Sequence, residues 1–192
     1  GEHAICAGLK EEMYVTIKGH VGYYCGGMNQ KAKITIQGNA GTGLGENMMS
    51  GTIHVKGNVS QSAGATAHGG TIIVDGDASS RCGISMKGVE IIVKGSVGHM
   101  SAFMAQAGTL LICGDAGDAL GDSIYETVIY MAGKPKTLGV DCIEKKITKK
   151  DLKKIENLLK TGNIKKLKPH NFKKFGSARK LYNFNIDNAS EY

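Results

Sequence analysis

Glycine-rich motifs are the first candidates for chemistry in this 192-residue sequence, which contains 28 glycines. Spaced glycines can cradle a phosphate group when a single glycine-rich turn connects a strand to the N-terminus of a helix. Here the pattern G-x-x-G-x-x-x-G recurs along the chain, for example at Gly19, Gly22 and Gly26, and no helical pattern follows it. These glycines therefore indicate backbone corners and not a nucleotide site.

The other side chains that could act in catalysis or bind a metal are scattered. The six histidines fall at different positions of the repeat described below, and no two cysteines form a C-x-x-C pair. The carboxylates are dispersed as well, as Asp75 and Asp122 illustrate. The odd number of five cysteines predicts reduced structural thiols and no disulfide framework. We therefore predict no catalytic, cofactor-binding or metal-ligating residue in this chain.

A 19-residue repeat organises the first two thirds of the sequence. Glycine recurs at seven positions spaced by 19 residues, and the chain is apolar two and four residues before each of them, as at Val15 and Ile17. Such alternation predicts a short strand with one buried face. Further small or apolar columns lie two and six residues after each glycine. Three inward patches per repeat predict an all-β solenoid, a single-stranded parallel β-helix of about seven coils stacked roughly 4.8 Å apart.

The corner glycines of these coils are predicted to be structural. They occupy positions that tolerate only small residues, either because φ is positive or because adjacent coils leave no room. The set is Gly19, Gly22, Gly26, Gly38, Gly41, Gly45, Gly57, Gly76, Gly95, Gly114, Gly117, Gly121 and Gly133. Coils without insertions provide no long loops to wall a cleft, which argues against a polysaccharide-cleaving enzyme.

One outward column of the predicted sheet becomes apolar halfway along the solenoid. Its members are Ile73, Ile92, Leu111 and Tyr130. Stacked apolar side chains on an exposed sheet face favour association, so something must cover them. The cover is either the C-terminal tail or a partner protein, and these residues are candidate interface positions.

The pattern changes at the C-terminal end, which divides the chain into a β-helix over 1–140 and a basic segment over 141–192. The first part carries 10 Lys/Arg and 11 Asp/Glu, whereas the second carries 14 and 6. A helix of about 13 residues is predicted between an N-cap at Thr148 and a stop at Gly162. An extended tail follows, with aromatic candidates for the interface at Phe172, Phe175, Tyr182 and Phe184.

Basic residues interleaved with aromatics could stack on single-stranded nucleic acid. A terminal strap is a poor platform for stacking, so we favour anchoring of the tail on its own solenoid or on a neighbouring protein, with no nucleic-acid partner. No stretch reaches the ~20 apolar residues of a membrane span, and the first residues lack a signal-peptide pattern. We therefore expect a cytoplasmic protein with no membrane partner.

The 19-residue coils with G-x-x-G-x-x-x-G resemble the C-terminal GXGXG domain of the large subunit of glutamate synthase. The tail over 175–189 is similar to the ending of stand-alone subunits of this type. The resemblance implies a right-handed β-helix that spaces a glutaminase domain and an FMN-binding synthase domain, and to which no catalytic residues are attributed. One subunit of formylmethanofuran dehydrogenase, a tungsten or molybdenum enzyme, has similar coils.

The resemblance implies a non-catalytic scaffold subunit of a split glutamate synthase-like oxidoreductase. Its expected partners are an amidotransferase-type subunit and a synthase-type subunit that carries FMN and iron–sulfur clusters, with a second copy of the chain as a further partner. Two alternatives remain: the β-helical subunit of a formylmethanofuran dehydrogenase, or a free-standing binding protein that acts through its basic aromatic tail.

Overall fold

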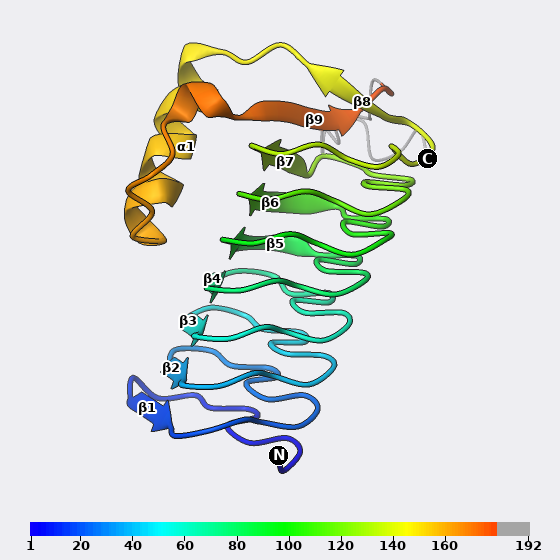
Figure 1. Cartoon of the computed structure of the whole chain (residues 1–192). Coiled ribbons are helices and arrows are strands. Elements are labelled where there is room, and N and C mark those ends of the chain that lie inside the picture. The colour runs from blue at the N-terminus through cyan, green and yellow to red at the C-terminus, as the bar shows by residue number, and fades with distance from the viewer. Residues whose placement is uncertain (180–192) are drawn as a thin grey trace, which may run out of the picture.

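The chain folds as a parallel β-solenoid. The computed structural model describes residues 1–179 (Figure 1). Seven parallel strands stack in chain order: β1 (Tyr14–Ile17), β2 (Lys33–Ile36), β3 (Thr52–Val55), β4 (Thr71–Val74), β5 (Lys87–Val93), β6 (Ala107–Ile112) and β7 (Val128–Met131). The register advances by 19 residues at each step, as in Val15 opposite Ile34 and Ile34 opposite Ile53. The predicted solenoid with 19-residue coils is confirmed, and its seven strands are separated by six full turns.

Three inward columns fill the interior, as the repeat predicts. The strand column is fully enclosed in the middle of the solenoid, where Ile53 and Ile72 are inaccessible to solvent. The column two residues after each glycine forms a second ladder of single parallel bridges, which runs from the Val21–Ala40 pair to the Ala116–Pro135 pair. The third column, six residues after each glycine, is completely buried from Cys25 to Leu120.

The corner glycines serve two different purposes. At the repeat glycine itself the coils lie too close for a side chain, because a Cβ on Gly38 would stand 2.5 Å from the carbonyl oxygen of Gly19. Seven residues later the backbone is left-handed, with φ of +64° at Gly45, a conformation that costs glycine little. The fifth coil places Ala102 in that left-handed position, with φ of 57°.

A ladder of polar side chains follows the repeat glycines along one corner. Each side chain accepts a hydrogen bond from the backbone N–H one coil further on, at 2.7–3.0 Å. The accepting residues are His20, Asn39, Asn58, Asp77, Ser96 and Asp115. This corner ladder pairs backbone donors at the turns, where the strand ladders cannot reach them.

The segment after residue 140 reverses direction and closes one end of the solenoid. It contributes β8 (Cys142–Lys145), α1 (Lys149–Thr161), a 3-10 turn (Pro169–Asn171) and β9 (Lys173–Ser177). Strand β9 lies between β7 and β8 and is antiparallel to both, so the sheet order ends β7-β9-β8. Figure 1 shows α1 running beside the strands from β7 toward β5.

The predicted C-terminal helix is confirmed together with its N-cap. The Thr148 hydroxyl accepts a hydrogen bond from the Asp151 N–H, and the Asp151 carboxylate accepts one from the Thr148 N–H at 2.8 Å. This reciprocal capping box satisfies N–H groups that the first turn leaves unpaired. Gly162 follows the last helical residue and donates its N–H to the Leu158 carbonyl.

The described residues, 1–179, include no helix with the length and apolar character that a membrane span requires.

Candidate protein interface

The outward apolar column is covered by the chain's own helix. Ile73, Ile92, Leu111 and Tyr130 form a second buried cluster with Ile155, Leu158, Leu159 and Phe172, and Leu111 is completely inaccessible. The sequence left two possibilities for what covers this column, the C-terminal tail or a partner protein. The structure shows that the C-terminal segment covers it. These four candidate interface residues are therefore not free to contact another protein.

A buried carboxylate fixes the helix on the sheet. Asp151 accepts hydrogen bonds from the Tyr130 hydroxyl at 2.6 Å and from the Lys174 ammonium at 2.8 Å. Burial alone would raise the pKa of Asp151, but the hydrogen bonds from Lys174, Tyr130 and Thr148 hold it well below its usual range. Burial, together with the neighbouring Asp151 carboxylate, raises the pKa of the Tyr130 hydroxyl. The charged form of Asp151 thus joins α1, β7 and β9.

The described aromatics of the C-terminal segment are also buried. Phe172 lies in the cluster under α1, and Phe175 packs against the end of the solenoid core, opposite Ile129 of β7. Because both rings are covered, neither offers a platform for stacking nucleic-acid bases, as the binding-protein alternative requires. The other two candidates, Tyr182 and Phe184, lie outside the described residues.

Beyond the end of α1, the outer sheet face carries a polar cluster. Asp75 accepts from Lys94 at 2.7 Å and from the His54 Nε2 at 2.8 Å, and Lys56 lies 3.4 Å away. Burial would raise the pKa of Asp75, but its hydrogen bonds to Lys94 and His54 lower it. The cluster thus pairs one carboxylate with two lysines and a histidine. Residues 1–179 hold no group of three His, Cys, Asp or Glu side chains that could bind a metal ion.

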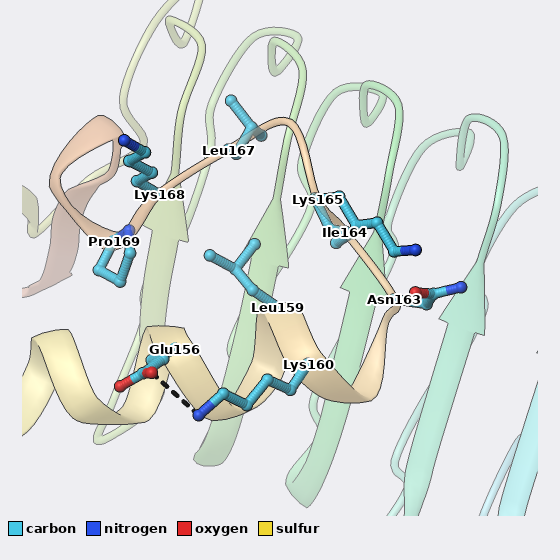
Figure 2. Close-up of a pocket in the computed structure, with 9 residues that line it drawn as sticks. All are labelled: Glu156, Leu159, Lys160, Asn163, Ile164, Lys165, Leu167, Lys168 and Pro169. Carbon is cyan, nitrogen blue, oxygen red and sulfur yellow. Dashed lines mark ion pairs between the residues drawn. The ribbon is translucent and has the colours of Figure 1, made fainter.

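Two hollows lie where the chain returns from α1. Figure 2 shows the first, of about 390 Å³, between the helix and the segment that follows it, with Leu159 and Pro169 among its lining residues. The second, of about 600 Å³, adjoins it and includes Lys94 and Cys113. Burial raises the pKa of the Cys113 thiol to about 11, so it is protonated near neutral pH and is a poor nucleophile. Apart from Cys113, the side chains that line the two hollows are lysines, the single carboxylate of Glu156, and apolar or amide groups.

Three of the five cysteines are buried, whereas Cys6 and Cys113 are partly exposed. All five are free, and Cys25 and Cys82 lie in one buried column. Burial raises the pKa of both thiols to about 12. Thiols with such pKa values are inert at neutral pH, which agrees with the reduced structural role expected from the sequence.

The other end of the solenoid has no covering strand or helix in the described chain. Strand β1 is the first in the sheet order and has a neighbour on one side only. Its inward residues Val15 and Ile17 are partly exposed, whereas the equivalent Ile34 and Ile36 of β2 are buried. Tyr14 on the outer face is 82% exposed. Among the described residues, β1 therefore covers less of the core at its edge than the strands that follow it.

The repeat architecture is shared with known proteins. The family model described as "GXGXG motif" matches residues 2–186. The chain belongs to the GXGXG family. A curated relative, Protein GlxC of Rhizobium meliloti (strain 1021), is 62% identical over 96 residues, which are 50% of this chain and 42% of the relative. The family match confirms the GXGXG repeat on which the resemblance rests.

Sequence reasoning missed three polar features of this GXGXG protein. The corner ladder corresponds to a column of Asn, Asp, Ser and His one residue after each repeat glycine from Gly19 to Gly114, and that column is the signal that could have revealed it. The Asp75 cluster joins three adjacent coils, so its signal is a 19- to 21-residue offset between opposite charges. Asp151 contacts Tyr130 and Lys174, and no sequence period connects those positions.

Proposed function

We propose that this GXGXG protein is a non-catalytic structural subunit of a split glutamate synthase-like oxidoreductase. It would space an amidotransferase-type subunit from a synthase-type subunit that carries FMN and iron–sulfur clusters. The observation that carries the proposal is the 19-residue register that the strands keep from β1 to β7 in a member of this family, with one irregularity between Lys87 and Glu90 of β5. A stacked coil is a spacer of fixed length, because each coil is hydrogen-bonded to both neighbours.

The chemistry of the described residues supports a structural role. The thiols have raised pKa values, and the Asp75 and Asp151 carboxylates are neutralised by lysines. General acid–base or nucleophilic catalysis needs a group whose pKa lies near the working pH, placed beside the reacting atoms. No residue that lines either hollow has a pKa shifted toward neutral pH. The redox cofactors are accordingly assigned to the partner subunits. Five free thiols suit a reducing compartment, so we place the protein in the cytoplasm.

Coexpression with candidate partner subunits tests the assembly. The tagged chain is expected to retain an amidotransferase-type and an FMN-containing subunit through purification, while the chain alone shows no flavin or cluster absorption. Glutamine hydrolysis or reductant oxidation by the purified chain alone would refute the non-catalytic assignment. Capture of a tungsten or molybdenum protein instead would assign the chain to a formylmethanofuran dehydrogenase.

Removal of one complete coil tests the spacer role separately from folding. Deletion of residues 58–76 joins Gly57 to Asp77 and keeps the repeat register, so the shortened solenoid is expected to fold. The rod becomes shorter by about 4.8 Å, the spacing between stacked strands. We expect each partner subunit to keep its partial reaction while ammonia transfer between them is impaired. Undiminished coupling with a folded deletion variant would argue against a spacer of defined length.

A further inference from the structure

The two hollows beside α1 adjoin one another and form one groove with an apolar floor. Leu159, Ile164 and Leu167 line the first hollow, and Ile164 and Leu167 also line the second, where the partly exposed Cys113 joins them. Figure 2 shows the segment over 163–168, which we call the return segment, running back beside α1. The two hollows together are called the return groove. Its floor is an apolar surface on which the side chains of a ligand can pack.

The rim of the return groove is positively charged. Five lysines line it, and the single carboxylate among the lining residues is that of Glu156. Glu156 pairs with Lys160 at 2.9 Å, and Lys94 pairs with Asp75 at 2.7 Å. The other three lysines are exposed and form no ion pair within residues 1–179; they are Lys165, Lys166 and Lys168. The rim therefore attracts anionic groups.

The return segment also has backbone groups that no described residue pairs. Within residues 1–179, the N–H groups of Lys165, Lys166 and Leu167 donate no hydrogen bond to another residue, whereas the Lys168 N–H donates to the Asn171 side chain at 2.7 Å. Unpaired backbone groups beside an apolar groove can bind an extended peptide through main-chain hydrogen bonds. A small inorganic anion would contact the lysines and leave both the floor and these groups unused.

Nucleic acid fits the return groove less well than a peptide. Single-stranded nucleic acid binds by stacking its bases on aromatic side chains as well as by pairing its phosphates with cations. Among the described residues, no aromatic side chain lines either hollow. The combination of cations, apolar floor and unpaired backbone groups favours a protein segment that contains both carboxylates and apolar side chains.

We propose that the return groove binds an extended acidic segment of a partner subunit. Its carboxylates pair with Lys165, Lys166 and Lys168, and its apolar side chains pack on Ile164 and Leu167. The inference rests on the proposed role as a subunit of a complex, and it identifies the surface of this chain that holds a partner and the chemistry of the partner's contact.

Charge reversal in the coexpressed complex tests the cationic rim. Lys165→Glu combined with Lys166→Glu is expected to weaken retention of one partner subunit about tenfold or more, because two attractions become repulsions. Both side chains are exposed, so the circular dichroism spectrum should not change. The matched control is Lys149→Glu combined with Lys150→Glu, which makes the same change of net charge at the start of α1 and should leave retention unaltered. A loss in both double variants, or in neither, would overturn the proposal.

The same experiment distinguishes this inference from the proposed function. If the native chain and the Lys165→Glu/Lys166→Glu variant retain the amidotransferase-type and FMN-containing subunits equally well, the chain is a subunit but the return groove is not its contact. If the native chain retains neither subunit, the proposed function fails and the inference fails with it.

Salt separates the charged part of the contact from the apolar part. Added sodium chloride should weaken the native complex, because exposed charges are screened, and the dependence should be shallower in the Lys165→Glu/Lys166→Glu variant. Leu167→Ala should weaken the complex roughly fivefold at low and high salt alike, since it removes apolar contact area. A salt dependence that the double variant leaves unchanged would contradict pairing at the rim.

Photo-crosslinking identifies the occupant of the return groove. Lys166→p-benzoylphenylalanine in the coexpressed complex places a photoreactive carbonyl at the rim, and mass spectrometry of the linked peptide gives its sequence. We expect a peptide of a partner subunit that is rich in Asp, Glu and apolar residues. A linked peptide without acidic residues, a link to residues 180–192 or to a second copy of this chain, or a link to nucleic acid would overturn the proposal.

Discussion

The two ends of the solenoid contain the same repeat but end it in different ways. At the C-terminal end β9 runs antiparallel over β7, Phe175 covers the core, and α1 buries the outer apolar column. At the β1 end the equivalent interior residues Val15 and Ile17 remain partly exposed. A stacked coil cannot bury its own last layer, so each end needs a cap of different topology or a partner. The closed end has its cap within the chain, whereas no described strand or helix covers β1.

A buried charge should separate the two ends most strongly. Ile129→Asp at the closed end places a carboxylate in a fully enclosed core and is expected to lower the free energy of unfolding by about 4 kcal/mol or more. Val15→Asp at the same repeat position of β1 should cost roughly 1 kcal/mol in the monomer, because Val15 is partly exposed. Urea unfolding monitored by circular dichroism measures both. Equal losses would mean that the two ends are equally closed.

Truncation of the capping aromatic gives the next largest difference. Phe175→Ala removes a ring that is 2% exposed and should destabilise the protein by about 3–5 kcal/mol. Tyr14→Ala, its matched control at the other end, should change monomer stability by less than about 0.5 kcal/mol, since Tyr14 is largely exposed. Thermal unfolding at low protein concentration compares the two variants. A small effect of Phe175→Ala would show that β9 is not a required cap.

Acid should loosen the closed end through Asp151. Its pKa is depressed in the folded state, so its contribution is fully present above the ordinary carboxyl pKa of about 4 and is lost as the pH falls below it. Stability measured between pH 7 and pH 3 should therefore decline less in Asp151→Asn than in the parent chain. Asp151→Asn should also cost about 2–3 kcal/mol at pH 7, because it leaves Lys174 without its partner. A parallel acid decline in both proteins would contradict this assignment.

The corner ladder should show the smallest effect. Asn58→Ala removes the acceptor of the Asp77 N–H and is expected to cost about 1 kcal/mol, since water can reach this exposed corner. His20→Ala, at the first position of the ladder near β1, should cost less than that. Hydrogen exchange of the Asp77 and Asn39 amides reports each loss directly. Unchanged exchange at Asp77 would show that the side-chain acceptor is dispensable.

The repetitive part of this fold could be predicted because one period determines strand, turn and interior together. The apolar columns from Val15 to Ile129 and from Ile17 to Met131, like the glycines at 19-residue spacing, each require the same stacking. Helix α1 could also be predicted, because Leu152, Ile155, Leu158 and Leu159 follow a helical period after the N-cap at Thr148. These features depend on contacts at fixed sequence offsets.

The closed end was not predictable in the same way. Strands β8 and β9 pair antiparallel across loops of irregular length, and only the folded chain brings Lys174 and Tyr130 to Asp151. The choice between the tail and a partner as cover for Ile92 depended on whether the helix docks on that face. Long-range docking of this kind carries no periodic signal.

The most direct test of the central claim is coupled turnover by the reconstituted complex. Amidotransferase-type and FMN-containing subunits are assayed for glutamine-dependent glutamate formation with and without this chain. If the chain is a structural subunit, glutamine hydrolysis and reductant oxidation should each persist without it. The coupling of the two reactions to form glutamate should require it. Full coupling in its absence, or a partial reaction performed by the chain itself, would contradict the account.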